Sequence, residues 1–230
     1  MDEVISLTSN MSLKNFLPVI ISVTIATVAA GQSSLIKYDL FDLNKNAKLQ
    51  PFNRKLESIM DKEQKAVRFS ESEGDGVAWL DAVNFTNGII ELDIKGKDVL
   101  QQSFVGIAFH GKDEKTLDAV YFRPFNFQST DSVRHIHAVQ YVSHPDFPWN
   151  VLRETQDGKY EKAIASAPGP NDWFHAKIVV DYPHIMVYVN NSSSPCLSVD
   201  KLNDRQNGKI GLWVGNNSGG DFANLVITNK

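Results

Sequence analysis

The sequence predicts an all-β fold, an antiparallel β-sandwich of jelly-roll type built from two curved sheets. From residue 66 onward, apolar and polar residues alternate with the period of two that half-buried strands require. Gly, Asn, Asp and Pro separate the alternating segments, for example at 74–76 and 168–171, as expected for turns. No long amphipathic helical pattern interrupts these segments. Two packed sheets are therefore the architecture that buries their apolar faces.

Ten strands are expected in chain order. They are residues 66–71, 76–80, 88–96, 103–111, 119–127, 136–143, 173–182, 185–192, 209–216 and 222–229. Within 209–216, Ile210, Leu212 and Val214 share one face, so we expect them to point into the core between the sheets.

Two earlier segments have a less regular pattern. Residues 40–43 and 51–53 are typical of an entry segment that packs across a sheet, and residues 55–65 fit either a short helix or a hairpin. Because no repeat, low-complexity tract or linker divides the chain, residues 31–230 are expected to form one jelly-roll domain.

Residues 1–30 are expected to be a signal-peptide region. Lys14 is followed by an apolar run over 16–28, and small residues at 28–30 supply a cleavage site, which places the mature N-terminus near Gly31. The run is marginal for a membrane span, which usually needs about 20 apolar residues. We therefore expect an exported protein, periplasmic or extracellular, without a membrane span in the mature chain.

Composition excludes several classes of function. The net charge is −4 and no basic stripe is present, so nucleic acid is not expected as a partner. The single cysteine, Cys196, excludes an intramolecular disulfide framework and a thiolate metal cluster. A half-buried structural thiol is expected there.

The stretch 119–153 combines aromatic side chains with planar polar ones at high density. Aromatic rings stack on the apolar face of a sugar, and Arg, Asn, Gln and His bond its hydroxyl groups. We expect a ligand-binding cleft in which one strand before the stretch also takes part. The candidate ligand-binding residues are His110, Tyr121, Arg123, Asn126, His137, Gln140, Tyr141, Trp149 and Arg153. The alternative is that these aromatic residues are core and that the histidines are structural.

Arg123 precedes Pro124 in this stretch and is not expected to be buried without a partner. A carboxylate or a ligand should therefore lie beside it. On the preceding strand, Gly106 and Ala108 share a face with His110. Small side chains there leave room for a ligand, or they accommodate a large neighbour in the other sheet.

Two motifs could have carried catalysis or metal binding. Glu91 and Asp93 share a strand face, but the third acid that laminarinase-type retaining glucanases carry a few residues later is missing, so that mechanism is rejected. His135 and His137, read as strand residues, would share a face, yet no spacing has the specificity of a known metal motif. No metal site is assigned and no cofactor is expected, with calcium on loop oxygens near Asp221 or Asn216 kept as an alternative.

Eight short motifs carry a resemblance to a known family. They are GIIELDI at 88–94, FVGIAF at 104–109, YFRPFN at 121–126, AVQY at 138–141, GKYE at 158–161, WFHAK at 173–177, GKIGLW at 208–213 and FANL at 222–225. Their order resembles the concanavalin A-like lectin/glucanase superfamily and, more narrowly, the 3-keto-disaccharide hydrolase (glycoside-hydrolase-like) domain group of exported bacterial proteins. The resemblance implies carbohydrate bound on the concave face of a jelly roll.

Three functions remain open on the sequence. The first is an exported protein that binds a glycan on the concave face. The second is a glycoside hydrolase or lyase-type enzyme that acts on a (3-keto-)glycoside, with His or Glu as base and Arg123 holding an oxyanion. The third is a sandwich that binds a partner and has no small-molecule site. Binding is favoured because the sequence spacing names no acid–base pair.

Overall fold

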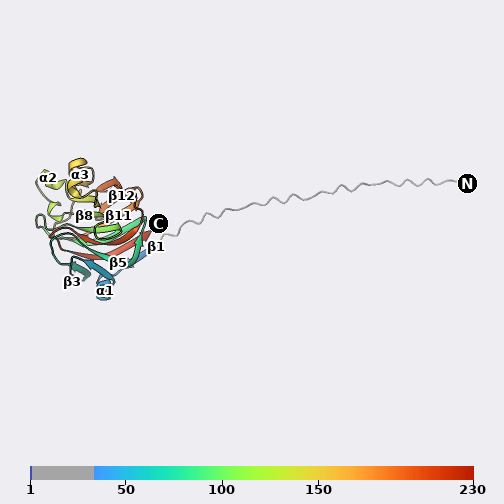
Figure 1. The fold of residues 1–230 in the computed structure, drawn as a ribbon, viewed down its shortest axis with the longest axis horizontal. Coiled ribbons are helices and arrows are strands. Elements are labelled where there is room, and N and C mark those ends of the chain that lie inside the picture. The colour runs from blue at the N-terminus through green and yellow to red at the C-terminus, as the bar shows by residue number, and fades with distance from the viewer. Residues whose placement is uncertain (2–33) are drawn as a thin grey trace. The chain divides into compact units, whose positions relative to one another are not determined.

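Alternating apolar residues pair into two antiparallel sheets in the computed structural model, which describes residues 34–230 together with Met1 (Figure 1). The predicted signal-peptide region lies outside the described residues, so export stays a prediction. The described part of the chain is an all-β sandwich, as the sequence predicted.

The first sheet has eight strands. In spatial order they are β13 (Leu197–Asp200), β12 (His184–Val189), β11 (Trp173–Asp181), β6 (Gly88–Lys95), β15 (Gly220–Asn229), β4 (Gln64–Phe69) and β3 (Leu56–Asp61), with β1 (Ser34–Tyr38) paired to β15. The second sheet has seven strands. In spatial order they are β10 (Glu161–Lys162), β9 (Val139–His144), β8 (Leu117–Phe122), β7 (Val105–Gly111), β14 (Gly208–Val214), β5 (Gly76–Phe85) and β2 (Leu49–Phe52).

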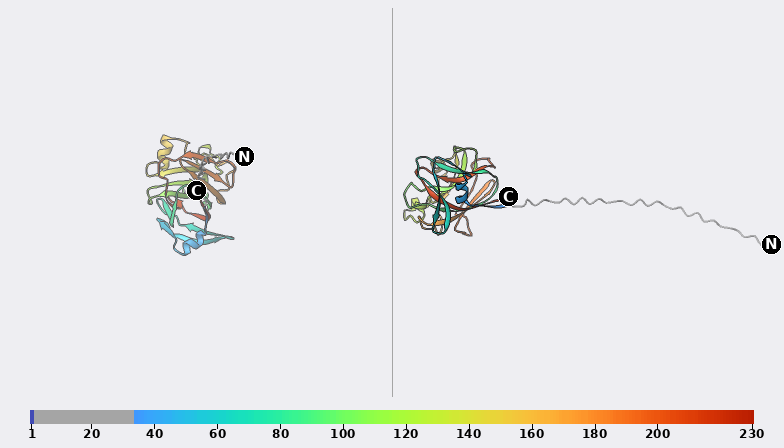
Figure 2. Two further views of the ribbon diagram at one scale, coloured as in Figure 1. Left: turned by 90° about the vertical axis from the view of Figure 1, so that its right-hand side faces the viewer. Right: turned by 90° about the horizontal axis from the view of Figure 1, so that it is seen from below.

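Short helices flank the sandwich at opposite ends. The helix α1 (Leu40–Lys45) lies beside the β3–β4 hairpin, whereas α2 (Ser132–His135) and α3 (Trp149–Thr155) lie at the other end, which the left view in Figure 2 also shows. A single 3-10 turn, η1 (Pro124–Asn126), follows β8. The η1 turn and α2 lie between the two strands of the stretch 119–153, and α3 begins after the second of them.

Aromatic contacts between the sheets identify the core face of the seven-stranded sheet. Phe122 on β8 packs edge-on against Phe174 on β11, with ring centroids 5.0 Å apart. Val105 pairs with Phe122 on one side and with Val214 on the other, so these side chains share that face. Leu212 is two residues from Val214 and fully buried, which confirms the predicted core face of this strand.

All ten predicted strand segments are present, and five short strands were not predicted. The missed strands are β1, β2, β3, β10 and β13. Residues 55–65 form the β3–β4 hairpin, one of the two alternatives for that segment. The sequential strands β7, β8 and β9 pair directly, so His110, Arg123 and Gln140 belong to one sheet or its immediate continuation.

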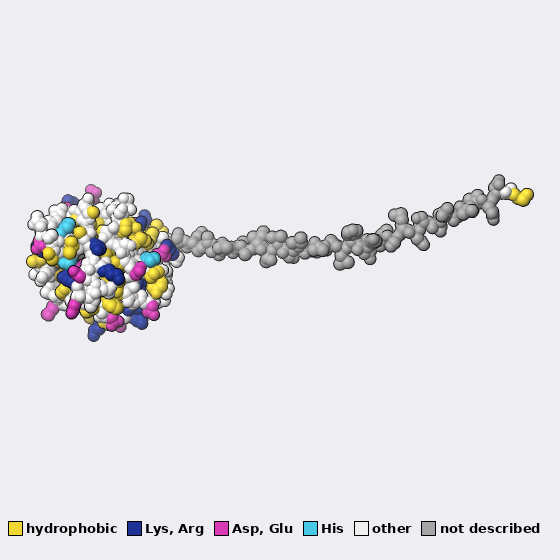
Figure 3. Space-filling view, turned by 90° about the horizontal axis from the view of Figure 1, so that it is seen from above, with side chains coloured by type: hydrophobic (Ala, Val, Ile, Leu, Met, Phe, Trp, Pro, Cys, Tyr) yellow, Lys and Arg dark blue, Asp and Glu magenta, His cyan; other side chains and the backbone are white. Residues whose placement is uncertain are grey.

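The surface has no region dominated by one sign of charge on the side drawn in Figure 3, where basic and acidic side chains are interspersed. Among the described residues, no helix has the length and apolar character needed to cross a bilayer.

Candidate functional site

The outer face of the seven-stranded sheet carries a cleft of about 650 Å³. Residues from β8, β9 and β14 form its floor, and η1, α2, α3 and two loops form its walls. The polar lining residues are Asp75, Gln101, Gln102, Tyr121, Arg123, Asn126, Arg134, His137, His144, Arg153, Asn216 and Asn217, and the large apolar ones include Leu100, Phe104, Phe125, Trp149 and Trp213.

Aromatic side chains form much of the cleft floor. Tyr121 on β8 lies against Trp213 on β14, with ring centroids 5.1 Å apart, and Phe104 packs edge-on against Tyr121. Gly106 on β7 lies between these strands. A Cβ there would come within 2.1 Å of the Val120 carbonyl oxygen and 2.6 Å of Tyr121 Cα. Glycine is thus required by the close approach of β8 within the same sheet, and not by a large neighbour in the other sheet.

Beside this floor lies a buried carboxylate with cationic partners. Glu161 on β10 accepts hydrogen bonds from Arg153 Nε and Nη2 at 3.0 and 2.8 Å, and Arg123 Nη1 lies 3.4 Å from Glu161 Oε2. His137 Nδ1 lies 2.8 Å from the same oxygen, close enough for an ion pair if the imidazole is protonated but not aligned for a hydrogen bond. The expected carboxylate partner of Arg123 is therefore Glu161.

Neutral acceptors complete the surroundings of Arg123. Its Nη2 donates to the Tyr121 hydroxyl at 2.7 Å and to Gln140 Oε1, and the Tyr121 hydroxyl also donates to Gln140 Oε1 at 2.7 Å. We call Glu161, Arg123, Arg153, His137, Tyr121 and Gln140 the open cluster, because four of its members line the cleft. This network fixes the rotamers of Tyr121 and Arg123 before any ligand arrives.

Burial and neighbouring charges shift the pKa values within the open cluster. Burial alone would raise the pKa of Glu161, but the hydrogen bond from Arg153 and the charges of both arginines outweigh it and lower that pKa. Burial lowers the pKa of His137, and the Glu161 charge offsets this only in part. Burial raises the pKa of Tyr121 to about 12, so its hydroxyl remains a donor at neutral pH.

The cleft rim combines an exposed tryptophan with arginine side chains. Trp149 at the start of α3 is 51% exposed, and the Arg153 guanidinium lies 5.2 Å from its ring centroid. Arg134 on α2 donates from Nε to Asn126 Oδ1 at 3.2 Å and from Nη2 to the Phe125 carbonyl at 2.8 Å. The rim thus presents an aromatic plane beside planar hydrogen-bond donors.

Two further titratable groups reach the cleft from different strands. Asp75, just before β5, is solvent-accessible, yet the surrounding walls desolvate its carboxylate and raise its pKa; the charges of His144 and Arg54 oppose this only in part. Burial lowers the pKa of His144 at the end of β9, and Asp75 partly opposes that shift. A carboxyl group with a raised pKa and a neutral imidazole are the groups that acid–base catalysis would use.

Seven of the nine predicted ligand-binding residues lie together at this cleft. Tyr121, Arg123, Asn126, His137, Trp149 and Arg153 line it, and the fully buried Gln140 lies directly beneath Tyr121 and Arg123. The remaining two, His110 and Tyr141, do not reach it. Tyr141 pairs with Val120 on the core face of β8, so the expectation that Tyr141 supplies a cleft wall is wrong.

His110 and Tyr141 belong to a second buried group, which we call the closed cluster: Asp118, Lys201, His110, Tyr141, Asn203 and Arg205. Asp118 accepts from Lys201 Nζ at 2.8 Å, from the Tyr141 hydroxyl at 2.7 Å and from Asn203 Nδ2 at 2.6 Å. Arg205 Nη2 lies 3.3 Å from its carboxylate. His110 donates from Nε2 to the Thr86 carbonyl and accepts from Lys201 Nζ at Nδ1, at 2.6 and 2.8 Å. Lys201, Asn203 and Arg205 come from the connection between β13 and β14, and no member of this cluster lines the cleft.

Two other assignments are corrected by the fold. His135 ends the helix α2 and His137 lies between α2 and β9, so these histidines are not a pair on one strand face. Glu91 and Asp93 lie on the eight-stranded sheet, where Asp93 contacts His175 Nδ1 at 2.9 Å and Glu91 lies 3.6 Å from His175 Nε2. They lie on the other sheet and do not line the cleft.

Several cleft residues were not among the predicted ones. Asp75 lies in a Gly-Asp-Gly turn without a sequence signal for a binding role, and Asn216 lies in a loop for which the sequence suggested only calcium. Glu161 could have been inferred from the requirement of Arg123 for a carboxylate, but its strand β10 has only two residues. Trp213 alternates with core residues on β14, and that alternation does predict an outward-facing side chain.

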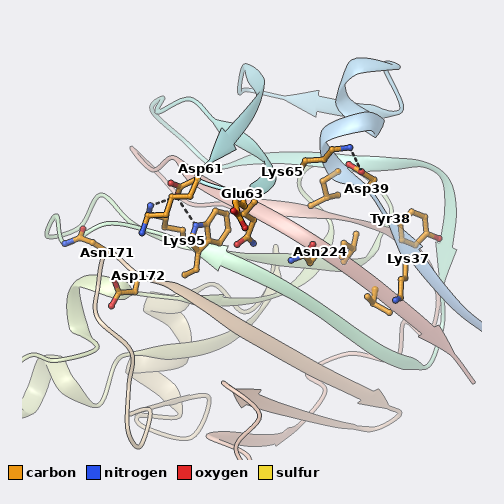
Figure 4. Close-up of a pocket in the computed structure, with 16 residues that line it drawn as sticks. Lys37, Tyr38, Asp39, Asp61, Glu63, Lys65, Lys95, Asn171, Asp172 and Asn224 are labelled. Atoms are coloured by element: carbon orange, nitrogen blue, oxygen red, sulfur yellow. Dashed lines mark hydrogen bonds and ion pairs between the residues drawn. The ribbon is translucent and has the colours of Figure 1, made fainter.

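A second cavity, of about 1100 Å³, lies beside α1 and the β3–β4 hairpin (Figure 4). Two of its lysines pair with acidic residues: Lys95 with Asp61 at 2.6 Å, and Lys65 with Asp39 at 3.3 Å. Trp173 donates from its indole nitrogen to Asp61 at 2.9 Å. The cleft on the seven-stranded sheet is the stronger candidate, because an exposed tryptophan, Trp149, lies there beside arginine side chains.

The loop oxygens considered for calcium have partners in the protein. Asp221 accepts two hydrogen bonds from Arg68 at 2.7 Å each, and Asn216 Oδ1 accepts from the Gly74 backbone at 2.7 Å. Within the described part of the chain, no group of three or more His, Cys, Asp or Glu residues is arranged to hold a metal ion. Calcium binding remains an untested alternative.

Solved structures resemble this chain in fold, although no family model and no curated protein matches its sequence. The chain is similar to a Bacillus subtilis protein of unknown function with a galectin-like fold (13% identity, TM-score 0.57, covering 84% of this chain and 94% of that one). It is similar to the carbohydrate-binding module CBM66 from Bacillus subtilis (14% identity, TM-score 0.51, covering 80% of this chain and 92% of that one). It also resembles domain 4 of AbnA, a GH43 extracellular arabinanase from Geobacillus stearothermophilus, in complex with arabinotriose (17% identity, TM-score 0.50, covering 86% of this chain and 93% of that one).

At these identities the comparisons show the fold alone. The architecture is that of a concanavalin A-like lectin/glucanase-type sandwich, which confirms the fold implied by the sequence resemblance.

Proposed function

We propose that the cleft on the seven-stranded sheet binds a carbohydrate. The observation that carries the proposal is Trp149, whose ring is half exposed at the rim with Arg153 lying across it. An exposed tryptophan costs hydration free energy unless a ligand covers it, and the apolar face of a sugar ring is a suitable cover.

The rest of the cleft supplies polar partners for hydroxyl groups. The amides of Gln102, Asn126, Asn216 and Asn217 line it, and each can both donate and accept. The volume of about 650 Å³ lies within the range of small-molecule sites. A carbohydrate-binding module and an arabinotriose-bound domain among the structural neighbours support the same class of ligand.

Replacing one tryptophan from each cavity allows a direct test. Binding of the chain to a glycan array identifies a ligand, and calorimetry then compares Trp149→Ala with Trp173→Ala, which alters the cavity of Figure 4. We expect Trp149→Ala to weaken binding on the order of 10-fold or more, because a stacking surface is lost, and to leave circular dichroism unchanged. Trp173→Ala should bind as the unmodified chain does.

Two results would contradict the proposal. If folded Trp149→Ala bound the glycan with unchanged affinity, the cleft would not be the binding site. Loss of binding in folded Trp173→Ala alone would move the ligand to the eight-stranded sheet.

A further inference from the structure

The cleft contains an unusual share of the chain's arginines. The sequence has six arginines, and three of them, Arg123, Arg134 and Arg153, line the cleft, whereas no lysine of the described residues does. The cavity beside α1 has the opposite composition among the described residues, with four lysines and no arginine. Arginine presents a planar fork that matches a carboxylate or a sulfate, whereas lysine is a flexible point charge. The cleft is therefore built for oriented contacts with an oxyanion.

The cationic side chains of this wall exceed its carboxylates. Glu161 alone serves both Arg123 and Arg153. Asp75 is the other carboxylate at the cleft among the described residues, and it directly precedes β5, which lies three strands away from β8 in the sheet. The wall formed by η1, α2 and α3 thus carries surplus positive charge, although the chain as a whole has a net charge of −4.

Arg134 is the arginine of this wall whose hydrogen-bond partners are all neutral. Its Nε and Nη2 donate to Asn126 and to the Phe125 carbonyl, and among the described residues no carboxylate lies within 4.0 Å of it. Asn126 is itself buried and donates to the His137 carbonyl at 3.0 Å, so the guanidinium is anchored on one side. Asp131 caps α2 by accepting from the backbone of Val133 and Arg134. The remaining N–H groups of this preoriented fork are available to a ligand.

We propose that the carbohydrate bound in this cleft is anionic, with a carboxylate or a sulfate ester held by Arg134. The inference rests on the proposed function and adds the chemical class of the ligand. A charge-assisted fork to Arg134 orients the sugar, while Trp149 covers one ring face and the cleft amides bond the hydroxyls.

The test uses oligosaccharides that differ only in charge. Calorimetry compares oligogalacturonate and oligomannuronate with galacto- and manno-oligosaccharides of equal length, and a sulfated galactose oligosaccharide distinguishes the two sources of the anion. We expect at least one acidic probe to bind roughly 10- to 100-fold more tightly than its neutral counterpart, the range of hydrogen bonds to a charged group. That preference should fall as the salt concentration rises.

Arg134→Gln should abolish the preference for the acidic probe, so that the acidic probe and its neutral counterpart bind with equal affinity. Arg134→Lys should restore only part of it, because the fork geometry is missing. Lys45→Gln is the matched control: it removes one positive charge from α1, away from the cleft, and should leave the preference intact.

Three outcomes would overturn the inference. Equal binding of acidic and neutral probes, or a preference that survives in Arg134→Gln, excludes the anion site while the carbohydrate function stands. Failure of every probe to bind overturns both the inference and the proposed function.

Discussion

The open and closed clusters each bury a carboxylate beside cationic side chains in the seven-stranded sheet, but only the open cluster lines the cleft. Each places a carboxylate that is at most 2% exposed beside two cationic side chains and a histidine, Glu161 in one and Asp118 in the other. The difference lies in access to solvent. Arg153 is 35% exposed in the open cluster, whereas the Lys201 side chain is fully buried in the closed one.

This comparison shows that a buried ion network does not by itself mark a binding site. The buried side chains of the closed cluster bond to one another, and none of its members lines the cleft. The open cluster uses Glu161 to hold two arginines whose other faces line a cleft. Access to solvent, and not the degree of pKa perturbation, distinguishes the two.

The largest expected effect comes from matched carboxylate-to-amide changes. Asp118→Asn should lower the free energy of unfolding by about 3–5 kcal/mol, because it leaves Lys201 buried without a counter-charge. Glu161→Gln should lower it by only about 1–3 kcal/mol, since Arg153 reaches water and Arg123 keeps its neutral acceptors. Equilibrium unfolding in denaturant measures both. A larger loss for Glu161→Gln would show that exposure does not separate the clusters.

Acidification should destabilise the closed cluster through His110. Burial, with the nearby Lys201 charge, lowers the pKa of His110 to about 4 from an ordinary value of 6.5. Because the unfolded chain takes up this proton first, His110 costs no stability above pH ~6.5, and stability is lost as pH falls from about 6.5 to 4, by up to about 3 kcal/mol.

Unfolding curves for the native chain and His110→Gln between pH 7.5 and pH 4 isolate this contribution. Asp118 and Glu161 titrate in both proteins and cancel in the difference. The native chain should lose more stability on acidification than the variant does. Parallel pH profiles would mean that His110 is protonated in the folded protein.

The sequence was a good guide to the fold because strand alternation is a local property. Ten segments with period two became ten strands, and the face assignment of Leu212 and Val214 followed from spacing alone. The missed strands are short or irregular: β10 has two residues, and β2 contains Pro51. Their pairing is set by neighbouring strands and not by their own composition.

The candidate site was predictable only in part because it depends on which face a residue occupies and on partners far along the chain. Tyr121 and Gln140 face outward and Tyr141 inward, although all three lie in the same aromatic stretch. His110 adopts a positive φ of 49° beside the register shift between β14 and β7, which no alternation rule anticipates. Lys201 and Asn203 enter the closed cluster from a segment about 80 residues after Asp118.

The smallest expected effect comes from removing the two tyrosine hydroxyls, one in each cluster, and comparing the losses of stability and of glycan affinity. Tyr141→Phe removes a hydrogen bond to the Asp118 carboxylate and should cost about 1.5–3 kcal/mol of unfolding free energy. Tyr121→Phe removes a hydroxyl bonded to Gln140 and Arg123, which still bond each other, so it should cost about 0.5–1.5 kcal/mol.

For glycan binding we expect the opposite order, with the larger loss in Tyr121→Phe. Tyr121→Phe loosens the rotamer of Arg123 at the cleft and should weaken glycan affinity measured by calorimetry, whereas folded Tyr141→Phe should bind as the native chain does. If both variants bound equally, the hydroxyl of Tyr121 would serve stability alone, and the open cluster would be no more functional than the closed one.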